Sequence, residues 1–198
     1  DNNVLEDTLQ NHTSYETVVF KGLFTNNGVV RDNPEAHYLT IKLNGDIINN
    51  GIWENSYTEL NGTTNQTITM AADAVFAKGR LEDTDSTSTV TAGSNLYFSN
   101  DFVIDFEDGN NQEGQLILPS GLGYNLYLDS CEIQHAWLMG NGNQLHMSNW
   151  ASLADDTHVD EFNLMGNINI DGSGNVYFEG DNNVLEDTLQ NHTSYETV

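Results

Sequence analysis

Carboxylates are the most abundant reactive side chains in this sequence, and one stretch gathers them around a turn. The chain has 30 acidic and 5 basic residues, a net charge of −25 at pH 7. The segment DFEDGNNQEG, residues 105–114, offers hard oxygen ligands around a glycine, which is the donor type that Ca²⁺ prefers. Asp105, Glu107 and Asp108 are therefore the candidate metal ligands. Their spacing does not match an EF-hand, so the segment indicates at most a structural Ca²⁺ site, and we expect no other cofactor.

Further carboxylates raise the question of polysaccharide cleavage. Asp101 precedes the candidate metal segment, and a second group lies within residues 155–161. Hydrolysis of a glycosidic bond needs paired carboxylates at defined separations. An acidic sugar would also need a cluster of basic residues, and the five in this chain are scattered. A solvated acidic surface is the simpler interpretation, and we expect no enzymatic activity.

Other sites for ligands or catalysis have little support in the sequence. Cys131 and His135 alone cannot form a zinc site, and the chain has no nucleophile elbow, P-loop or dinucleotide fingerprint. Trp53, Trp137 and Trp150 could stack on sugar rings, although packing in the core or at a corner is the more common role for them. The strong acidity argues against nucleic acid and anionic membranes as partners. No apolar stretch is long enough to span a membrane, so insertion is not expected.

Short strands separated by Asn and Gly must position all of these groups. Asn and Gly tolerate positive φ and therefore mark tight turns. Between them lie segments in which apolar and polar residues alternate, which is the period of a β-strand. Examples are HYLTIKLNG (37–45), NQTITM (65–70), NLYFS (95–99) and NVYFEG (175–180). No segment shows a sustained helical period with caps, and residues 69–83 fit either a short helix or a strand.

A weak internal period indicates how the strands are arranged. LFTNNGVV (23–30) resembles IINNGIW (47–53), and similar patterns follow at intervals of roughly 19 to 31 residues, so about seven coils fit in 180 residues. Imperfect repeats of this length predict an all-β fold, a parallel β-solenoid with coils stacked on one another and Asn ladders at the corners. A β-sandwich is the alternative, but it does not explain the recurring NNG.

Eighteen residues, DNNVLEDTLQNHTSYETV, occur at 1–18 and again without a mismatch at 181–198. A flexible linker would be rich in Gly, Ser or Pro, whereas this segment contains residue types that pack. We interpret residues 1–180 as one complete repeat unit and 181–198 as the start of the next. An engineered or closing duplication is the alternative. The apolar side chains expected at the seam between units, called the seam residues, are Val4, Leu5, Leu9, Tyr15 and Val18.

Residues 39–70, LTIKLNGDIINNGIWENSYTELNGTTNQTITM, resemble the repetitive β-helical surface proteins of Bacteroidetes. In that family L-x-I-x-G-x-I-x-N-N-G-x-W is followed by L-N-G-T-x-x-Q-T-I, and the likeness is fainter over residues 96–180. The resemblance implies a right-handed parallel β-helix that is secreted or displayed at the cell surface as an adhesin or structural fibre, without catalytic residues. The irregular coil lengths and the 180-residue repeat depart from the family pattern.

The same resemblance implies a possible modification. Hosts of that family attach O-glycans at Asp-Ser/Thr followed by a small or apolar residue, and Asp7-Thr8-Leu9 fits, so Thr8 is a candidate glycosylation site. The sequence thus predicts a structural repeat module of an extracellular filament or giant surface adhesin. Its expected partners are copies of itself and surface glycans. The alternative is a β-helix that binds or degrades polysaccharides.

Overall fold

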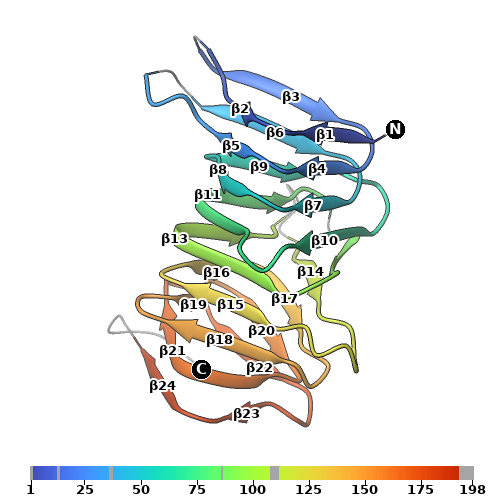
Figure 1. The fold of residues 1–198 in the computed structure, drawn as a ribbon. Helices are drawn as coiled ribbons and strands as arrows, with labels where there is room; N and C mark the ends of the chain where they lie inside the picture. Colours follow the sequence, from blue (N-terminus) through green and yellow to red (C-terminus); the bar gives the residue numbers. More distant parts are fainter. Residues whose placement is uncertain (1, 13, 36–37, 86, 108–111, 192–198) are drawn as a thin grey trace.

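The computed structural model describes residues 2–12, 14–35, 38–85, 87–107 and 112–191 of the chain. These residues form 24 strands and no helix, and the strands wind into a parallel β-solenoid of about eight turns (Figure 1). The predicted β-solenoid is therefore confirmed, and residues 75–83, left open between helix and strand, form a strand. Within the described ranges, no helix could serve as a membrane span.

Nine parallel strands form one sheet, called face 1, with one strand from each coil. Alternation of apolar and polar residues puts every second side chain into the interior. The strands of face 1 are β1 (Asn3–Leu5), β4 (Phe24–Asn26), β7 (Ile47–Asn49), β10 (Gln66–Met70), β12 (Thr89–Ala92), β14 (Gly114–Ile117), β17 (Ala136–Met139), β20 (Thr157–Asp160) and β22 (Val176–Glu179).

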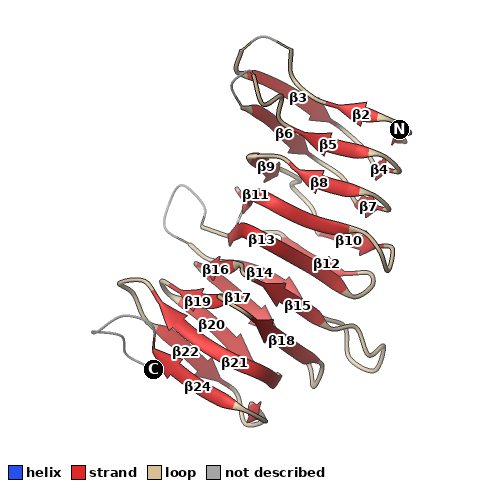
Figure 2. Cartoon of the chain, turned by 60° about the vertical axis from the view of Figure 1, so that its left-hand side comes forward, coloured by secondary structure: helices blue, strands red, loops and turns tan. Residues whose placement is uncertain are grey.

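The second sheet has 15 strands and covers two sides of the solenoid, called face 2 and face 3 (Figure 2). Face 2 contains β2 (Thr8–Leu9), β5 (Val29–Arg31), β8 (Ile52–Glu54), β15 (Leu126–Asp129), β18 (Gln144–Ser148) and β23 (Val184–Leu185). Face 3 contains β3 (Glu16–Phe20), β6 (Leu39–Leu43), β9 (Tyr57–Leu60), β16 (Glu132–Gln134), β19 (Ser152–Ala154) and β24 (Thr188–Asn191). Three long strands run across both faces: β11 (Val75–Asp83), β13 (Leu96–Asp105) and β21 (Asn163–Asp171).

Residues with left-handed backbone mark the line along which this sheet bends from face 2 to face 3. A left-handed residue interrupts the extended backbone, so a strand can turn a corner within one or two positions. A long strand can therefore pair with two different strands of a neighbouring coil, as β11 does with β8 and then β9, while β11 and β13 pair with each other along both faces. The residues on this line are Lys78 (φ 61°), Asn100 (φ 56°), Ser130 (φ 54°), Asn149 (φ 55°) and Gly166 (φ 89°).

Asn-Gly pairs make the corner from face 1 to face 2 in the second and third coils. Asn26 and Asn49 are fully buried there, and Asn26 Nδ2 donates to Asn49 Oδ1 at 2.8 Å. A Cβ atom on Gly28 would lie 1.8 Å from the carbonyl oxygen of Asp7, and one on Gly51 would lie 2.0 Å from that of Gly28. Only glycine fits such close contact between coils. The predicted asparagine ladder is present at this corner.

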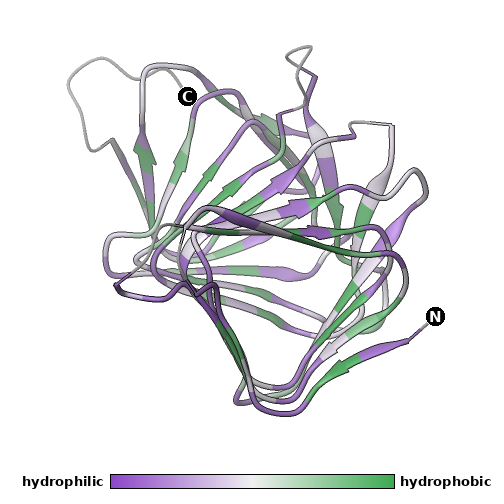
Figure 3. Cartoon of the chain, turned by 90° about the horizontal axis from the view of Figure 1, so that it is seen from above, coloured by the Kyte–Doolittle hydropathy of each residue, from purple (hydrophilic) through white to green (hydrophobic). Residues whose placement is uncertain are grey.

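Apolar side chains form columns in the interior. Phe24, Ile47 and Ile68 are aligned by the parallel register and are almost fully buried. The buried ring of Trp53 lies 5.3 Å from that of Phe76, and its Nε1 donates to a threonine hydroxyl. Seen from above, the stacked coils surround this interior with alternating hydrophobic and hydrophilic positions (Figure 3). Trp53 is thus a core residue and cannot be a platform for sugars.

The structure has about eight turns, whereas the corner spacing indicated about seven in 180 residues. The difference arises in the longest of the expected intervals, the one between Trp150 and Asp181. This interval contains a further corner at Gly166, where β21 bends from face 2 to face 3. Because the nine residues of β21 form one continuous strand, the bend was not recognised as the corner of a separate coil.

Candidate functional site

Successive coils bring distant polar residues together on face 3. Parallel pairing aligns Glu82 of β11 with Asp105 of β13, and Asp105 with Gln134 of β16. His135 follows Gln134 and adopts a left-handed conformation (φ 49°). Residues from three successive coils, with Asp105 and His135 30 positions apart in the sequence, thereby meet at one point on the surface.

Asp105 is the centre of this cluster. It is only 6% exposed, and its carboxylate accepts hydrogen bonds from Arg80 Nη2 and, at 2.7 Å, from Gln134 Nε2. Nδ1 of His135 lies 3.1 Å from Asp105 Oδ1 and 3.6 Å from Glu107 Oε2. A buried carboxylate needs such partners, because desolvation of an unpaired charge is unfavourable.

The predicted metal ligands are therefore partly brought together. Ligand atoms of Asp105, Glu107 and His135 lie within 4.8 Å of one another, whereas Asp108 lies outside the described residues. Ca²⁺ takes six to eight oxygen ligands, and this group combines two carboxylates with an imidazole. The guanidinium of Arg80 already neutralises Asp105. Within the described residues, the contacts of Asp105 with Arg80, Gln134 and His135 thus form a network of charged and polar groups that links three coils and explains the cluster without a metal ion.

Desolvation also affects two neighbouring carboxyl groups on face 3. Burial raises the pKa of Glu82, and the nearby Arg80 only partly offsets this effect. Burial likewise raises the pKa of Glu132, and the charges of Asp171 and Asp155 add to the increase. Both groups bind a proton more readily than an exposed glutamate does.

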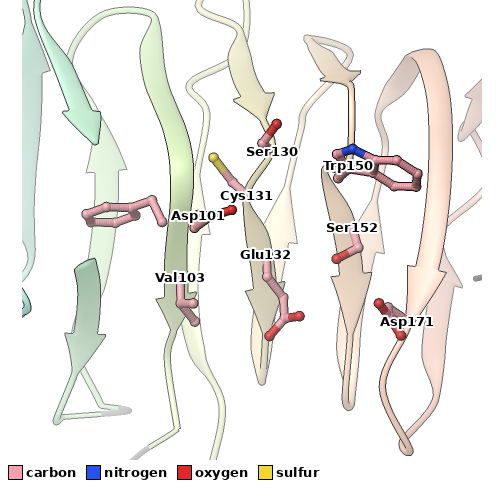
Figure 4. Close-up of a pocket in the computed structure, with 9 residues that line it drawn as sticks. Asp101, Val103, Ser130, Cys131, Glu132, Trp150, Ser152 and Asp171 are labelled. Atoms are coloured by element: carbon pink, nitrogen blue, oxygen red, sulfur yellow. The ribbon is translucent and has the colours of Figure 1, made fainter. Parts of the chain in front are cut away.

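A groove of about 320 Å³ lies on the outside of the bend between faces 2 and 3 (Figure 4). Trp150 stands beside it with 74% of its surface exposed. Glu132 reaches into the groove from the coil before that of Trp150, and Asp171 from the coil after it. Burial raises the pKa of Cys131 to about 12, so this thiol is protonated and unreactive at neutral pH. The lining residues are Asp101, Phe102, Val103, Ser130, Cys131, Glu132, Trp150, Ser152 and Asp171.

Two of the other carboxylates singled out in the sequence, Asp155 and Asp156, have structural partners. Asp155 Oδ1 accepts backbone N–H groups of Ser173 at 2.7 Å and Gly174 at 2.6 Å. Asp156 Oδ1 accepts the N–H of Asn175 at 3.3 Å. These carboxylates hold the turn that leads from β21 to β22, and this accounts for their position without a catalytic role.

The seam residues lie in the first coil and differ in burial. Val4 is 57% exposed on β1 and Tyr15 is 67% exposed before β3. Leu5, Leu9 and Val18 are half-buried and pack against the core. Thr8 on β2 is exposed, and its hydroxyl donates to Asp7 Oδ1 at 3.4 Å. The apolar side chains of the first coil are thus only partly covered by the rest of the solenoid. The candidate glycan acceptor, Thr8, faces solvent.

Aromatic ladders on the outer surface are a feature that sequence reasoning missed. Tyr97 stacks on Tyr127 at 4.8 Å, and Tyr127 on His146 at 4.5 Å. Trp137 stacks on His158 at 4.7 Å, so it belongs to such a ladder. The sequence could have indicated these ladders, because the aromatic residues occupy equivalent strand positions in successive coils. Their mutual stacking accounts for these rings without a ligand.

Comparison with known proteins adds no further constraint. No family model, curated protein or solved structure matches the chain. The resemblance to repetitive β-helical surface proteins rests on residues 39–70, and the architecture expected from it, a parallel β-solenoid, is the one observed.

Proposed function

We propose that the chain is a structural repeat module of an extracellular filament or giant surface adhesin, whose units stack end to end. One observation carries the proposal. Described residues of the second copy extend the solenoid: Val184–Leu185 and Thr188–Asn191 pair in parallel with β21 and continue the ninth coil, which begins at β22. The segment that starts one unit therefore also continues the solenoid of the preceding one.

The C-terminal end of the solenoid has the chemistry of an incomplete core. An apolar hollow of about 190 Å³ is lined by Leu164, Phe178, Leu185 and Leu189, together with the side chain of Asn183. A further coil would bury this surface at roughly 25 cal/mol for each Å² removed from water. Another copy of the same chain is the partner that supplies such a coil.

A chain of two units, residues 1–180 followed by residues 1–198, tests the stacking. Eight coils and part of a ninth at ~4.8 Å each correspond to a rise of about 40 Å per unit. We expect small-angle scattering to show one rod lengthened by about this amount. A Leu185→Asp variant is the control, because it should weaken the junction while each unit stays folded. A broad distribution of distances between two separate bodies would contradict the proposal.

The Trp150 groove supports polysaccharide binding as a second candidate function. An exposed tryptophan next to carboxylates and hydroxyls is suited to stacking and hydrogen bonding with a sugar. Three acidic residues line the groove and no basic residue does, so a neutral glycan fits better than a uronic acid polymer. Titration with neutral oligosaccharides should show binding that Trp150→Ala removes and Tyr57→Ala, a distant exposed aromatic, leaves unchanged. Equal loss in both variants would contradict the site.

We also propose that the module is not an enzyme and is located outside the cell. Support comes from the structural roles of Asp105, Asp155 and Asp156 described above, and from the resemblance of residues 39–70. Thr8 remains the proposed glycan acceptor, since its hydroxyl is exposed. Mass spectrometry of the protein from its native source would show the glycan. Cleavage of a polysaccharide that is lost in Glu132→Gln would instead favour a degradative function.

A further inference from the structure

The two identical segments occupy different faces of the same solenoid. In the first copy, Asn3–Leu5 pairs with β4 on face 1, and Thr8–Leu9 pairs with β5 on face 2. In the second copy, Val184–Leu185 pairs with β21 on face 2, and Thr188–Asn191 pairs with β21 on face 3. The same residues have therefore advanced by one face after 180 positions.

The course of the chain explains the advance. β22, which ends at Glu179, already occupies face 1 of the ninth coil and pairs with β20. Gly180 (φ 74°) begins the turn that follows, and only a few residues separate it from Val184. A segment so short cannot return to face 1 in a parallel sheet, which needs a whole crossover connection. The next strand must lie on face 2.

We infer that consecutive units are joined with an advance of one face, so that each unit is rotated by about a third of a turn relative to the one before it. This inference rests on the proposed end-to-end stacking. One repeat then contains eight coils and one additional face. Val184–Leu185 belongs to face 2 of one unit and, as the counterpart of Asn3–Leu5, to face 1 of the next.

The open strands at the two ends fit this arrangement. Among the described residues, β22 is the last strand of face 1 and β3 pairs only with β6, so each has one edge without a neighbouring strand. With an advance of one face, β3 of the following unit lies on β22. Val18 and Phe20 of β3 point toward the core and are half-buried in the first coil. Their counterparts would cover Phe178 and the apolar hollow beside it.

Cysteine pairs on neighbouring strands test the arrangement, because parallel strands ~4.8 Å apart lie within disulfide reach. In the 198-residue chain, Asn163→Cys with Val184→Cys should form a disulfide under mild oxidation, since the structure pairs these positions. The matched control, Tyr177→Cys with Val184→Cys, should not. Native Cys131 is buried and should stay reduced. Absence of the first disulfide, or formation of the second, would overturn the inference.

The two-unit chain separates the inference from the proposed function. Tyr177→Cys should bond with a cysteine placed at Thr17 or Val19 of the second unit. Residue 184 of this chain is Val4 of the second unit, so its pairing with Thr25 of that unit is an internal control that forms a disulfide in either arrangement. Peptide mapping by mass spectrometry would identify each bond. A continuous rod in which neither Thr17 nor Val19 bonds to Tyr177 would disprove the one-face advance and leave stacking intact. Two separate bodies that lack all bonds across the junction would disprove stacking itself.

Discussion

The second and third coils and the later coils build the same solenoid with different corners. In the early coils, face 1 meets face 2 at Asn-Gly pairs, where buried asparagines form a ladder and the backbones are in close contact. In the fourth to seventh coils that corner is longer, as in residues 118–125, and the sharp bend lies between faces 2 and 3 at left-handed residues. One architecture thus tolerates two corner designs, provided that the inward-facing columns stay aligned.

The largest expected change in stability comes from replacing a glycine, and the two regions should differ in how much such a replacement costs. Gly28→Ala places a Cβ atom against a carbonyl oxygen of the preceding coil, so we expect the free energy of unfolding to fall by about 3 kcal/mol. Gly121 has no atom within 4 Å of such a Cβ, and only its left-handed backbone (φ 74°) opposes the change. Gly121→Ala should therefore lower it by about 1 kcal/mol. Denaturant titration of both variants measures the difference, and equal losses would show that coil contact is not decisive.

The inner and outer asparagine positions of the third coil provide a second test. Asn49→Ala removes one of the two acceptors of Asn26 Nδ2 and leaves it only the carbonyl oxygen of Ile52 at 3.2 Å, so we expect a loss of about 2 kcal/mol. Asn50 Nδ2 donates at 2.8 Å to Asn27 Oδ1 on the exposed surface. Asn50→Ala should change stability by less than about 0.5 kcal/mol, because water replaces the lost partner. A similar loss in both would contradict a special role for the buried ladder.

The third comparison concerns how much an ion pair in each region contributes to stability. Arg80→Met leaves Asp105, with a side chain only 8% exposed, without its guanidinium partner. We expect a loss of about 1–2 kcal/mol, smaller than for a fully buried pair because Arg80 is itself a third exposed. Lys42→Met removes the more exposed pair with Glu59 and should lower stability by less than about 1 kcal/mol. Thermal unfolding followed by circular dichroism would rank the two variants, and the reverse order would contradict this account.

The smallest effect concerns pH and the carboxyl groups of face 3. The pKa of Glu132 is raised in the folded state, so this state binds a proton that the unfolded state does not. Its contribution to stability therefore increases as pH falls through the raised pKa and is complete below the ordinary value of 4.5. Solvent screening keeps it below about 1 kcal/mol.

Glu132→Gln isolates this contribution. At neutral pH the variant should be slightly more stable than the parent protein, and the difference should disappear on acidification toward the ordinary glutamate pKa. Comparing the two proteins cancels the opposite contribution of His146, whose pKa is lowered by burial. A difference that grows on acidification would show that the folded state does not favour protonation of Glu132.

Much of the fold could be predicted from the sequence. Alternation and Asn-Gly corners identified the strands and their stacking, because both depend on residues that are neighbours in the chain. The corner at Gly166 was missed because it bends one long strand and no obvious loop interrupts it. The duplicated segment was recognised, but its shift by one face depends on how many coils lie between the copies, and the residues reveal that number only indirectly.

The candidate sites were less predictable because each is assembled across coils. Asp105 and Glu107 were identified from their spacing, whereas Arg80 and His135, which determine their electrostatics, lie 25 and 30 residues from Asp105. Glu132, Trp150 and Asp171 meet in one groove, yet nothing in their local sequence connects them. Only the register of parallel strands brings such residues together, and that register follows from coil lengths.

Parallel stacking also determines how the molecule would respond to force. The hydrogen bonds between coils run along the long axis, so a pull at the two ends acts directly on the bonds between one coil and the next. The coils would then detach one after another, starting at an end, and the sheets would not slide as a block. Each released coil of about 22 residues adds roughly 70–80 Å of extended chain. A tether built from such units would lengthen in many small steps and dissipate energy at each of them.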